Sequence, residues 1–223
     1  MDDFTVARTK MVDNQLRTQS VTDYGVLSVM GEVPRERFLP PASRALAYID
    51  SDLALAAAEA GGQARYMMEP APLARLVQLA EVGRGDVVLV VGCGTGYAAA
   101  VLARLANAVV ALEQDPDLAR RASEALLDLG VDNVAVVTGP LEAGYPTEAP
   151  YDVIFVDGAV EVVPASLLDQ LKDGGRLVAV VGYGRSDAAT VFRRSGADIG
   201  SRVAFDADVR PLPGFRRPKA FVF

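Results

Sequence analysis

The sequence contains an apolar run that ends in three closely spaced glycines, Asp86-Val87-Val88-Leu89-Val90-Val91-Gly92-Cys93-Gly94-Thr95-Gly96-Tyr97. Apolar residues resume after the glycines as Ala98-Ala99-Ala100-Val101-Leu102-Ala103. This order predicts a buried strand, a tight glycine turn and a helix that begins near Tyr97. Such a turn brings backbone N–H groups and the N-terminus of a helix close to a bound nucleotide-like cofactor. The sequence therefore predicts a cofactor socket at this turn.

Short apolar strands alternate with helices on both sides of the turn. Strands are expected at 86–91, 108–112, 134–138, 153–156 and 176–181, and helices at 72–82, 97–105, 116–129 and 164–171. Two helices are expected before this region, at 1–19 and 22–33, and antiparallel edge strands after it, at 203–205 and 219–223. Strands made of nearly continuous Val, Leu and Ile indicate a parallel sheet with both faces covered. The predicted fold class is α/β, with a Rossmann-like arrangement.

The composition favours one globular domain in a reducing compartment. The 223 residues carry a net charge of -7, which argues against a broad nucleic-acid or anionic-membrane surface. Cys93 is the only cysteine, so no intrachain disulfide can form and a cytoplasmic location is expected. Neither a signal-peptide pattern nor a membrane-spanning stretch is present. There is no histidine, which excludes mechanisms that need an imidazole base or metal ligand.

An acidic residue stands where a ribose could bind. Glu113 follows the second core strand, about 20 residues after the first glycine, and a carboxylate there can accept both ribose hydroxyls. A solvated carboxylate at a strand end is the alternative interpretation. The Gly-x-Gly-x-Gly spacing differs from the Gly-x-Gly-x-x-Gly of dinucleotide sites, which favours S-adenosylmethionine, a cofactor without a pyrophosphate. Asp115 and Pro116, just after Glu113, are typical of a helix start.

Ordered motifs along nearly the whole chain resemble the protein-L-isoaspartate O-methyltransferase family. They are Met-Val-x-x-Gln-Leu at 11–16, Val-Pro-Arg-Glu-x-Phe-Leu-Pro at 33–40, Ala-Tyr-x-Asp at 47–50, Gly-Gln at 62–63, the glycine turn with its helix to 103, Leu-Gly-x-x-Asn-Val at 129–134, Ala-Pro-Tyr-Asp-x-Ile at 149–154, and Gln-Leu-Lys-x-Gly-Gly-Arg-Leu-Val at 170–178. The resemblance implies a seven-stranded methyltransferase sheet, mostly parallel, with an antiparallel C-terminal strand. It implies a single domain over 1–223, with a helical cap and substrate-side segment at 1–70 and a cofactor-binding core at 71–223.

The resemblance also implies S-adenosylmethionine as the cofactor, with S-adenosyl-L-homocysteine as its product. The implied contacts come from the glycine turn and from Glu113, and we add neighbouring positions on the same rim. The full set of expected cofactor contacts is Gly92, Cys93, Gly94, Gly96, Tyr97, Glu113, Gln114, Gly139, Pro140, Leu141, Asp157, Met68 and Glu69. No metal site is expected.

The sequence departs from the family pattern at three places around this pocket. The family's Gly-Gln-Thr-Ile-Ser-Gln-Pro is replaced by a longer segment at 62–70, Gly-Gln-Ala-Arg-Tyr-Met-Met-Glu-Pro. The family's Gly-Asp-Gly, which meets the adenine amino group, is Gly-Pro-Leu at 139–141. Because a proline has neither an N–H to donate nor a carboxylate, packing or Glu142 would have to hold the adenine. The family's Thr-Ala-Ala-Ala is Asp-Gly-Ala-Val at 157–160.

The replaced side chains each allow a structural and a functional interpretation. Arg65 is expected to be a solvated loop residue, or else to pair with a substrate carboxylate through its forked donors. Residues 66–68, Tyr-Met-Met, are expected to form an apolar wall over the cofactor. Glu69 either receives the ammonium of the cofactor or starts the next helix. Asp157 lies on the rim where such sheets bind ligands, or is a turn residue before Gly158.

The leading functional hypothesis is an S-adenosylmethionine-dependent methyltransferase that acts on carboxylates. Its acceptors would be isoaspartyl residues of proteins or peptides, or a small carboxylate, and its catalytic candidates are Arg65, Tyr66 and Asp157. Because a carboxylate acceptor is already anionic, the lack of histidine is no obstacle. The alternatives are a protein that binds the cofactor or its product without catalysis, a metal-assisted catechol-type methyltransferase suggested by Phe-Val-Asp-Gly at 155–158, and a nicotinamide-dependent oxidoreductase.

Overall fold

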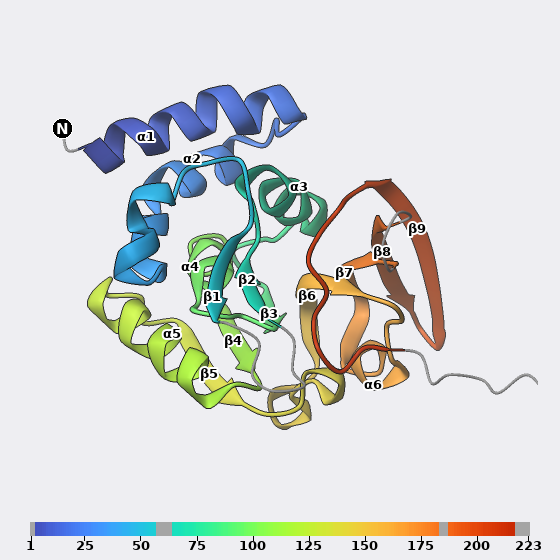
Figure 1. The fold of residues 1–223 in the computed structure, drawn as a ribbon. Helices are drawn as coiled ribbons and strands as arrows, with labels where there is room; N and C mark the ends of the chain where they lie inside the picture. The colour runs from blue at the N-terminus through green and yellow to red at the C-terminus, as the bar shows by residue number, and fades with distance from the viewer. Residues whose placement is uncertain (1–2, 57–63, 183–186, 217–223) are drawn as a thin grey trace, which may run out of the picture.

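The computed structural model describes residues 3–56, 64–182 and 187–216 (Figure 1). The helices are α1 (Asp3–Met11), α2 (Tyr24–Glu32), α3 (Pro70–Ala80), α4 (Tyr97–Ala103), α5 (Pro116–Asp128) and α6 (Ala165–Leu168). The strands are β1 (Leu53–Ala56), β2 (Arg65–Met67), β3 (Val87–Val91), β4 (Ala108–Glu113), β5 (Val134–Thr138), β6 (Tyr151–Val160), β7 (Leu171–Val181), β8 (Ala188–Ser195) and β9 (Asp198–Asp206). Within the described helices, none is long and apolar enough to cross a lipid bilayer.

Seven strands form one sheet in the order β5-β4-β3-β6-β7-β8-β9. The pairings from β5 to β7 are parallel, whereas β8 runs antiparallel to both β7 and β9. The carboxyl ends of β3, β4 and β6 therefore lie along one edge, where α/β sheets bind their ligands. The predicted seven-stranded sheet with an antiparallel strand near its C-terminal end is confirmed.

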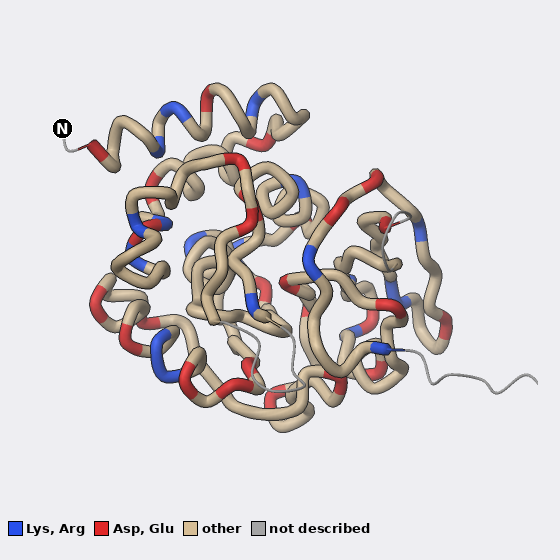
Figure 2. The backbone as a smooth tube through the Cα atoms, in the orientation of Figure 1, with Lys and Arg blue, Asp and Glu red and all other residues tan. Residues whose placement is uncertain are grey.

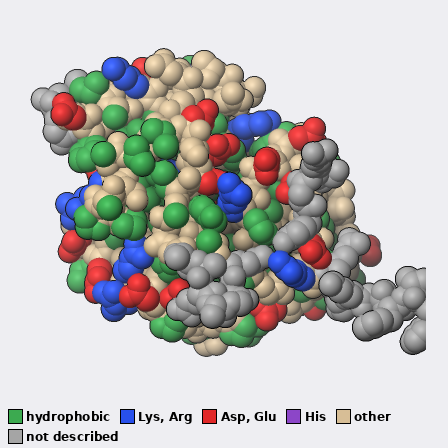
Figure 3. All heavy atoms as spheres, in the orientation of Figure 1, with side chains coloured by type: hydrophobic (Ala, Val, Ile, Leu, Met, Phe, Trp, Pro, Cys, Tyr) green, Lys and Arg blue, Asp and Glu red, His purple; other side chains and the backbone are tan. Residues whose placement is uncertain are grey.

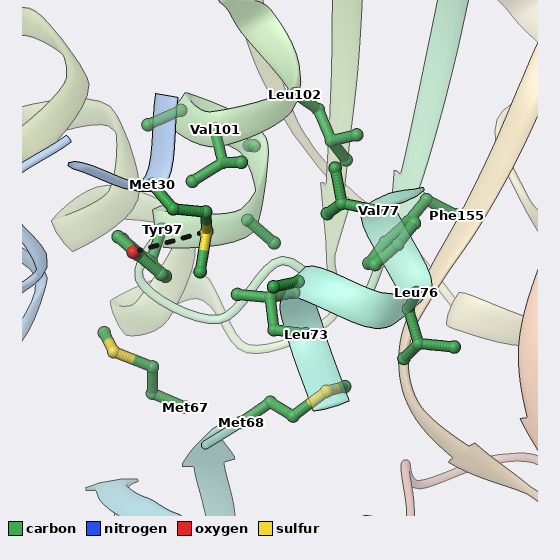
Figure 4. Close-up of a cluster of buried hydrophobic side chains, with 14 of the residues drawn as sticks. Met30, Met67, Met68, Leu73, Leu76, Val77, Tyr97, Val101, Leu102 and Phe155 are labelled. Atoms are coloured by element: carbon green, nitrogen blue, oxygen red, sulfur yellow. Dashed lines mark hydrogen bonds between the residues drawn. The ribbon is translucent and has the colours of Figure 1, made fainter. Parts of the chain in front are cut away.

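Both faces of the sheet are buried at its central strands, as their apolar sequences predict. In β3, Val88 and Val90 belong to a core that includes residues of α2, α3, α4 and α5. Leu89 and Val91 belong to a second core on the other face, which includes residues of α6 and the C-terminal segment 212–215. Figure 4 shows the first core, in which Met30 of α2 meets the hydroxyl of Tyr97 at 3.7 Å. The N-terminal region is thereby fixed against the helix that follows the glycine turn.

Some elements differ from the sequence expectations. The first helix changes at Val12 into a π-turn and then a 3-10 turn, and it does not continue as one helix to residue 19. Strand β8 was not anticipated, although it pairs with β9 over eight residues. The expected strand at 219–223 lies outside the described residues. A small second sheet, β1 paired with β2, was also missed because each strand has only three or four residues.

Two predicted helix starts are confirmed by their capping bonds. The carboxylate of Asp23 accepts the N–H of Val26 at the start of α2. The carboxylate of Asp115 accepts two N–H groups at the start of α5, and Pro116 occupies the first turn. Since α5 follows β4 directly, this cap also fixes the chain just after Glu113.

We expect Asp115→Ala to lower the free energy of unfolding by about 1 kcal/mol, because it leaves the first N–H groups of α5 without an acceptor. Asp117→Ala, on the exposed side of the same turn, should change stability little. Urea denaturation of the two variants and the parent measures the difference. Equal stability of the two variants would contradict a capping role.

Candidate functional site

The glycine turn joins β3 to α4, as the sequence predicts. The φ angles of Gly92, Gly94 and Gly96 are 81°, 57° and 96°, which glycine adopts without strain. Gly96 is the residue before the first turn of α4. The backbone N–H of Gly94 donates to the Oε2 atom of Glu113 at 2.8 Å, so the turn and the end of β4 meet directly.

The carboxylate of Glu113 is completely buried, and its partners all belong to the chain itself. Its Oε1 atom accepts the N–H groups of Gln114 and Asp115 at 2.9 and 3.1 Å. Arg65 completes the set, with Nη1 2.5 Å from Oε1 and Nη2 2.9 Å from Oε2. A carboxylate offers about four acceptor positions. With five donors in place, Glu113 has no acceptor left for a ribose hydroxyl.

Arg65 lies in β2 and is only 6% exposed, so the interpretation as a solvated loop residue is wrong. The pairing of β2 with β1 places it opposite Ala56, and its Nη2 atom also donates to the carbonyl oxygen of Gly92 at 3.1 Å. The charge of Glu113 offsets the cost of burying the guanidinium. The carboxylate that pairs with Arg65 therefore belongs to the protein itself, not to a substrate. No local sequence pattern predicted this contact, because the two residues are 48 positions apart.

Two leucines lie against the glycines of the turn. A Cβ built on Gly94 would lie 2.8 Å from a methyl of Leu55, and one on Gly92 would lie 2.9 Å from both methyls of Leu212. Leu212 is held by its N–H, which donates to the carbonyl of Ala159 at 2.8 Å. Side chains of β1 and of the C-terminal segment therefore fill the space that the glycines leave open.

A cavity of only about 10 Å³ remains beside the turn. Tyr66, Met67 and Met68 line it, as expected for an apolar wall, and Figure 4 shows both methionines at the margin of the core. This volume suffices for about one water molecule, whereas ligand pockets measure hundreds of Å³. The residue types suit an adenosyl cofactor, but the described arrangement does not admit one while Arg65 is bonded to Glu113.

Asp157 lines the same small cavity, near the end of β6. Burial away from water raises the pKa of its carboxyl to about 7. The positive charges of Arg65 and Arg35 oppose this rise, and the negative charges of Glu113 and Asp52 add to it. Two of the three catalytic candidates, Tyr66 and Asp157, therefore line one nearly filled space, whereas Arg65 is bonded to Glu113 and to the carbonyl of Gly92 and does not line it.

Some of the other residues expected to contact the cofactor lie at this small cavity, and others lie outside it. Cys93 is buried against the turn, and burial raises the pKa of its thiol, so it is not a nucleophile. Leu141 is buried in the second core, while Gln114 and Pro140 are exposed on the rim. Glu69 precedes α3 and lines a separate cavity with Arg75. Its N–H donates to Asp52 at 3.0 Å, which fits the helix-start interpretation.

A larger cavity of about 470 Å³ lies on the other side of Leu55. Arg37, Arg44 and Arg121 line it, together with residues of α5, and no sequence motif predicted it. Figure 3 shows basic, acidic and hydrophobic side chains intermixed on the surface of the molecule. Among the described residues, no cluster of three Cys, Asp or Glu side chains is arranged to hold a metal ion.

We expect Arg65→Ala to lower the free energy of unfolding by about 3–5 kcal/mol, because it leaves the buried carboxylate of Glu113 without its cation. Arg120→Ala is the matched control, since Arg120 also bonds two carboxylate oxygens, one of Asp117 and one of Glu124, but does so on the exposed side of α5. That variant should unfold almost like the parent in urea. A small effect of Arg65→Ala would show that the pair does not hold the site closed.

The raised pKa of Asp157 predicts a pH-dependent stability. The folded protein keeps this proton up to about pH 7, whereas the unfolded chain releases it near pH 4. Stability therefore falls between these values as pH rises. Asp157→Asn should remove that fall. Between pH 4 and pH 8, the free energy of unfolding of this variant should therefore rise by up to about 4 kcal/mol relative to that of the parent. Parallel urea titrations of both proteins across this range would refute the assignment if the two profiles coincide.

The family model and the related sequences that match this chain all indicate the same protein family. The model of the protein-L-isoaspartate(D-aspartate) O-methyltransferase family matches residues 7–209. A protein-L-isoaspartate O-methyltransferase from Gloeobacter violaceus is 38% identical over 91% of this chain and 96% of its own length. A protein-L-isoaspartate O-methyltransferase 2 from an Anaeromyxobacter species is 43% identical over 77% of this chain and 68% of its own length.

Solved structures agree with the sequence matches. A protein-L-isoaspartate O-methyltransferase superposes with a TM-score of 0.79 and 29% identity over 93% of this chain. This chain covers 66% of that solved chain, just under two thirds of its length. A Plasmodium falciparum structure with the same description, in complex with S-adenosyl-L-homocysteine, has a TM-score of 0.73 and 20% identity, which supports the fold. The chain belongs to the protein-L-isoaspartate O-methyltransferase family, whose members are methyltransferases that use S-adenosylmethionine.

Proposed function

We propose that this protein transfers the methyl group of S-adenosylmethionine to the carboxylate of isoaspartyl residues in proteins and peptides. The observation that carries the proposal is the meeting of the glycine turn with Glu113 at the edge formed by β3 and β4, within a chain that matches the family from residue 7 to residue 209. The product on the acceptor would be a methyl ester.

The site is suited to an acceptor that is already charged. A carboxylate needs no base to become a nucleophile, so the task of the protein is to orient the oxygen and to exclude water. Tyr66 and Asp157 stand beside the glycine turn in an apolar surrounding, and we assign to them the positioning of the acceptor. Gly92, Gly94 and Glu113 are assigned to the cofactor.

The location and the partners are part of the same proposal. A single buried cysteine supports a cytoplasmic location, and the net charge of -7 supports acceptors other than nucleic acid. Figure 2 shows acidic and basic residues interspersed along the described chain.

A peptide with one isoaspartyl residue should be methylated, and the same peptide with an ordinary aspartyl residue should not. Radiolabelled S-adenosylmethionine and base-labile methanol release measure the ester directly. Failure of this peptide and of a panel of small carboxylates, at a saturating cofactor concentration, would contradict the function. Cofactor binding without turnover would favour a regulatory binding protein.

A further inference from the structure

We propose that Arg65 is an internal competitor of the cofactor, which occupies the ribose subsite on Glu113 and must leave before an adenosyl group can bind. The inference rests on the proposed function, because it takes the natural ligand to be an adenosyl compound. It assigns to Arg65 a role in setting cofactor affinity, in place of a contact with the acceptor.

The competition follows from the shape of the two donors. A guanidinium presents two parallel N–H groups to the two oxygens of one carboxylate, as Nη1 and Nη2 of Arg65 do at 2.5 and 2.9 Å. The neighbouring hydroxyls of a ribose would approach the same oxygens from the same open side, because backbone N–H groups hold the rest of Glu113. Arginine and ribose therefore exclude each other at Glu113.

Arg65 also covers the first glycine of the turn. Its Nη2 atom donates to the carbonyl oxygen of Gly92 and would lie 3.5 Å from a Cβ built on that residue. One side chain thus occupies both the ribose-binding carboxylate and the backbone that a cofactor would approach. Together with Leu55 and Leu212, which lie against Gly94 and Gly92, this double contact covers the glycine turn.

Contacts around β2 keep Arg65 in this position. Ala54 pairs with Tyr66, and the guanidinium of Arg210 lies 5.2 Å from the centre of the Tyr66 ring. Arg210 in turn approaches Asp52 at 3.2 Å. Leu55 lines both the small cavity and the 470 Å³ cavity, so a displacement of β1 toward the larger space would open the smaller one.

Competition reduces the apparent affinity by the fraction of molecules in which Arg65 is released. If the bonded state holds nine tenths of the molecules or more, its removal tightens binding about tenfold or more. Arg65→Ala is therefore expected to bind S-adenosyl-L-homocysteine about tenfold or more tightly than the parent in isothermal titration. Arg65→Lys, which keeps the charge but not the fork, should fall between them. Arg120→Ala should match the parent.

A double-variant cycle tests whether the effect passes through Glu113. In a Glu113→Gln background the ion pair no longer exists, so adding Arg65→Ala should bring a much smaller gain than it does in the parent. If Arg65→Ala destabilises the protein too much to be titrated, Arg65→Lys and the parent still give the comparison. A gain of the same size in both backgrounds would overturn the assignment to the ribose subsite.

The parent protein offers a readout that needs no stability argument. With ¹⁵N-labelled arginine, the Nε–H resonance of Arg65, assigned by its loss in Arg65→Lys, should shift when S-adenosyl-L-homocysteine saturates the protein. An unmoved resonance, or parent binding that neither Arg65 variant improves, overturns the competition and leaves the proposed function intact. If neither the parent nor any variant binds S-adenosyl-L-homocysteine or S-adenosylmethionine, both proposals fail.

Discussion

The pair between Arg65 and Glu113 joins parts of the molecule that the chain keeps far apart. It attaches the small sheet of β1 and β2 to the end of β4, and through Gly92 and Gly94 it also fixes the glycine turn. A buried ion pair is costly to form and costly to break, because each partner left alone would face an apolar surrounding. The site is therefore held in one arrangement by electrostatics, while the two leucines over the glycines add only packing.

The same cation governs the charge balance of the cavity. Glu113 bonds directly to Arg65, and the positive charges of Arg65 and of the buried Arg35 both lower the pKa of Asp157. The Nη1 atom of Arg35 has no hydrogen-bond partner among the described residues, and its Nε atom donates to the carbonyl of Ala47 at 2.8 Å. Once Arg65 moves away, an apolar space holds two acidic groups with reduced compensation. A ligand that carries positive charge would restore the balance better than a neutral one.

The sequence was sufficient for features that depend on neighbouring residues. The glycine turn, the helix start at Asp115 and Pro116 and the strand that ends in Glu113 are local patterns, and each has the predicted structure. Strand β8 was missed because only three consecutive residues of it, 189–191, are buried and it ends in the polar run 193–195. Strands β1 and β2 were missed because they are very short. In contrast, no sequence pattern predicted that side chains of the protein itself would occupy the site. This occupation depends on Arg65 reaching across 48 positions and on Leu212 returning from the C-terminal segment, and neither contact leaves a periodic signal.

Arg65 belongs to a part of the chain that departs from the family pattern. It lies in the segment 62–70, where the sequence replaces the hydroxyl-bearing residues that the family has beside its cofactor. The glycine side of the socket, in contrast, keeps the family spacing and the positive φ angles. The departure from the family and the closure of the site thus coincide in one residue. Arg65 bonds to Glu113 and to the carbonyl of Gly92 and does not line the space around Tyr66 and Asp157. With Glu113 assigned to the cofactor as proposed, the difference between this chain and its relatives should lie in when the cofactor is admitted, before any acceptor is involved.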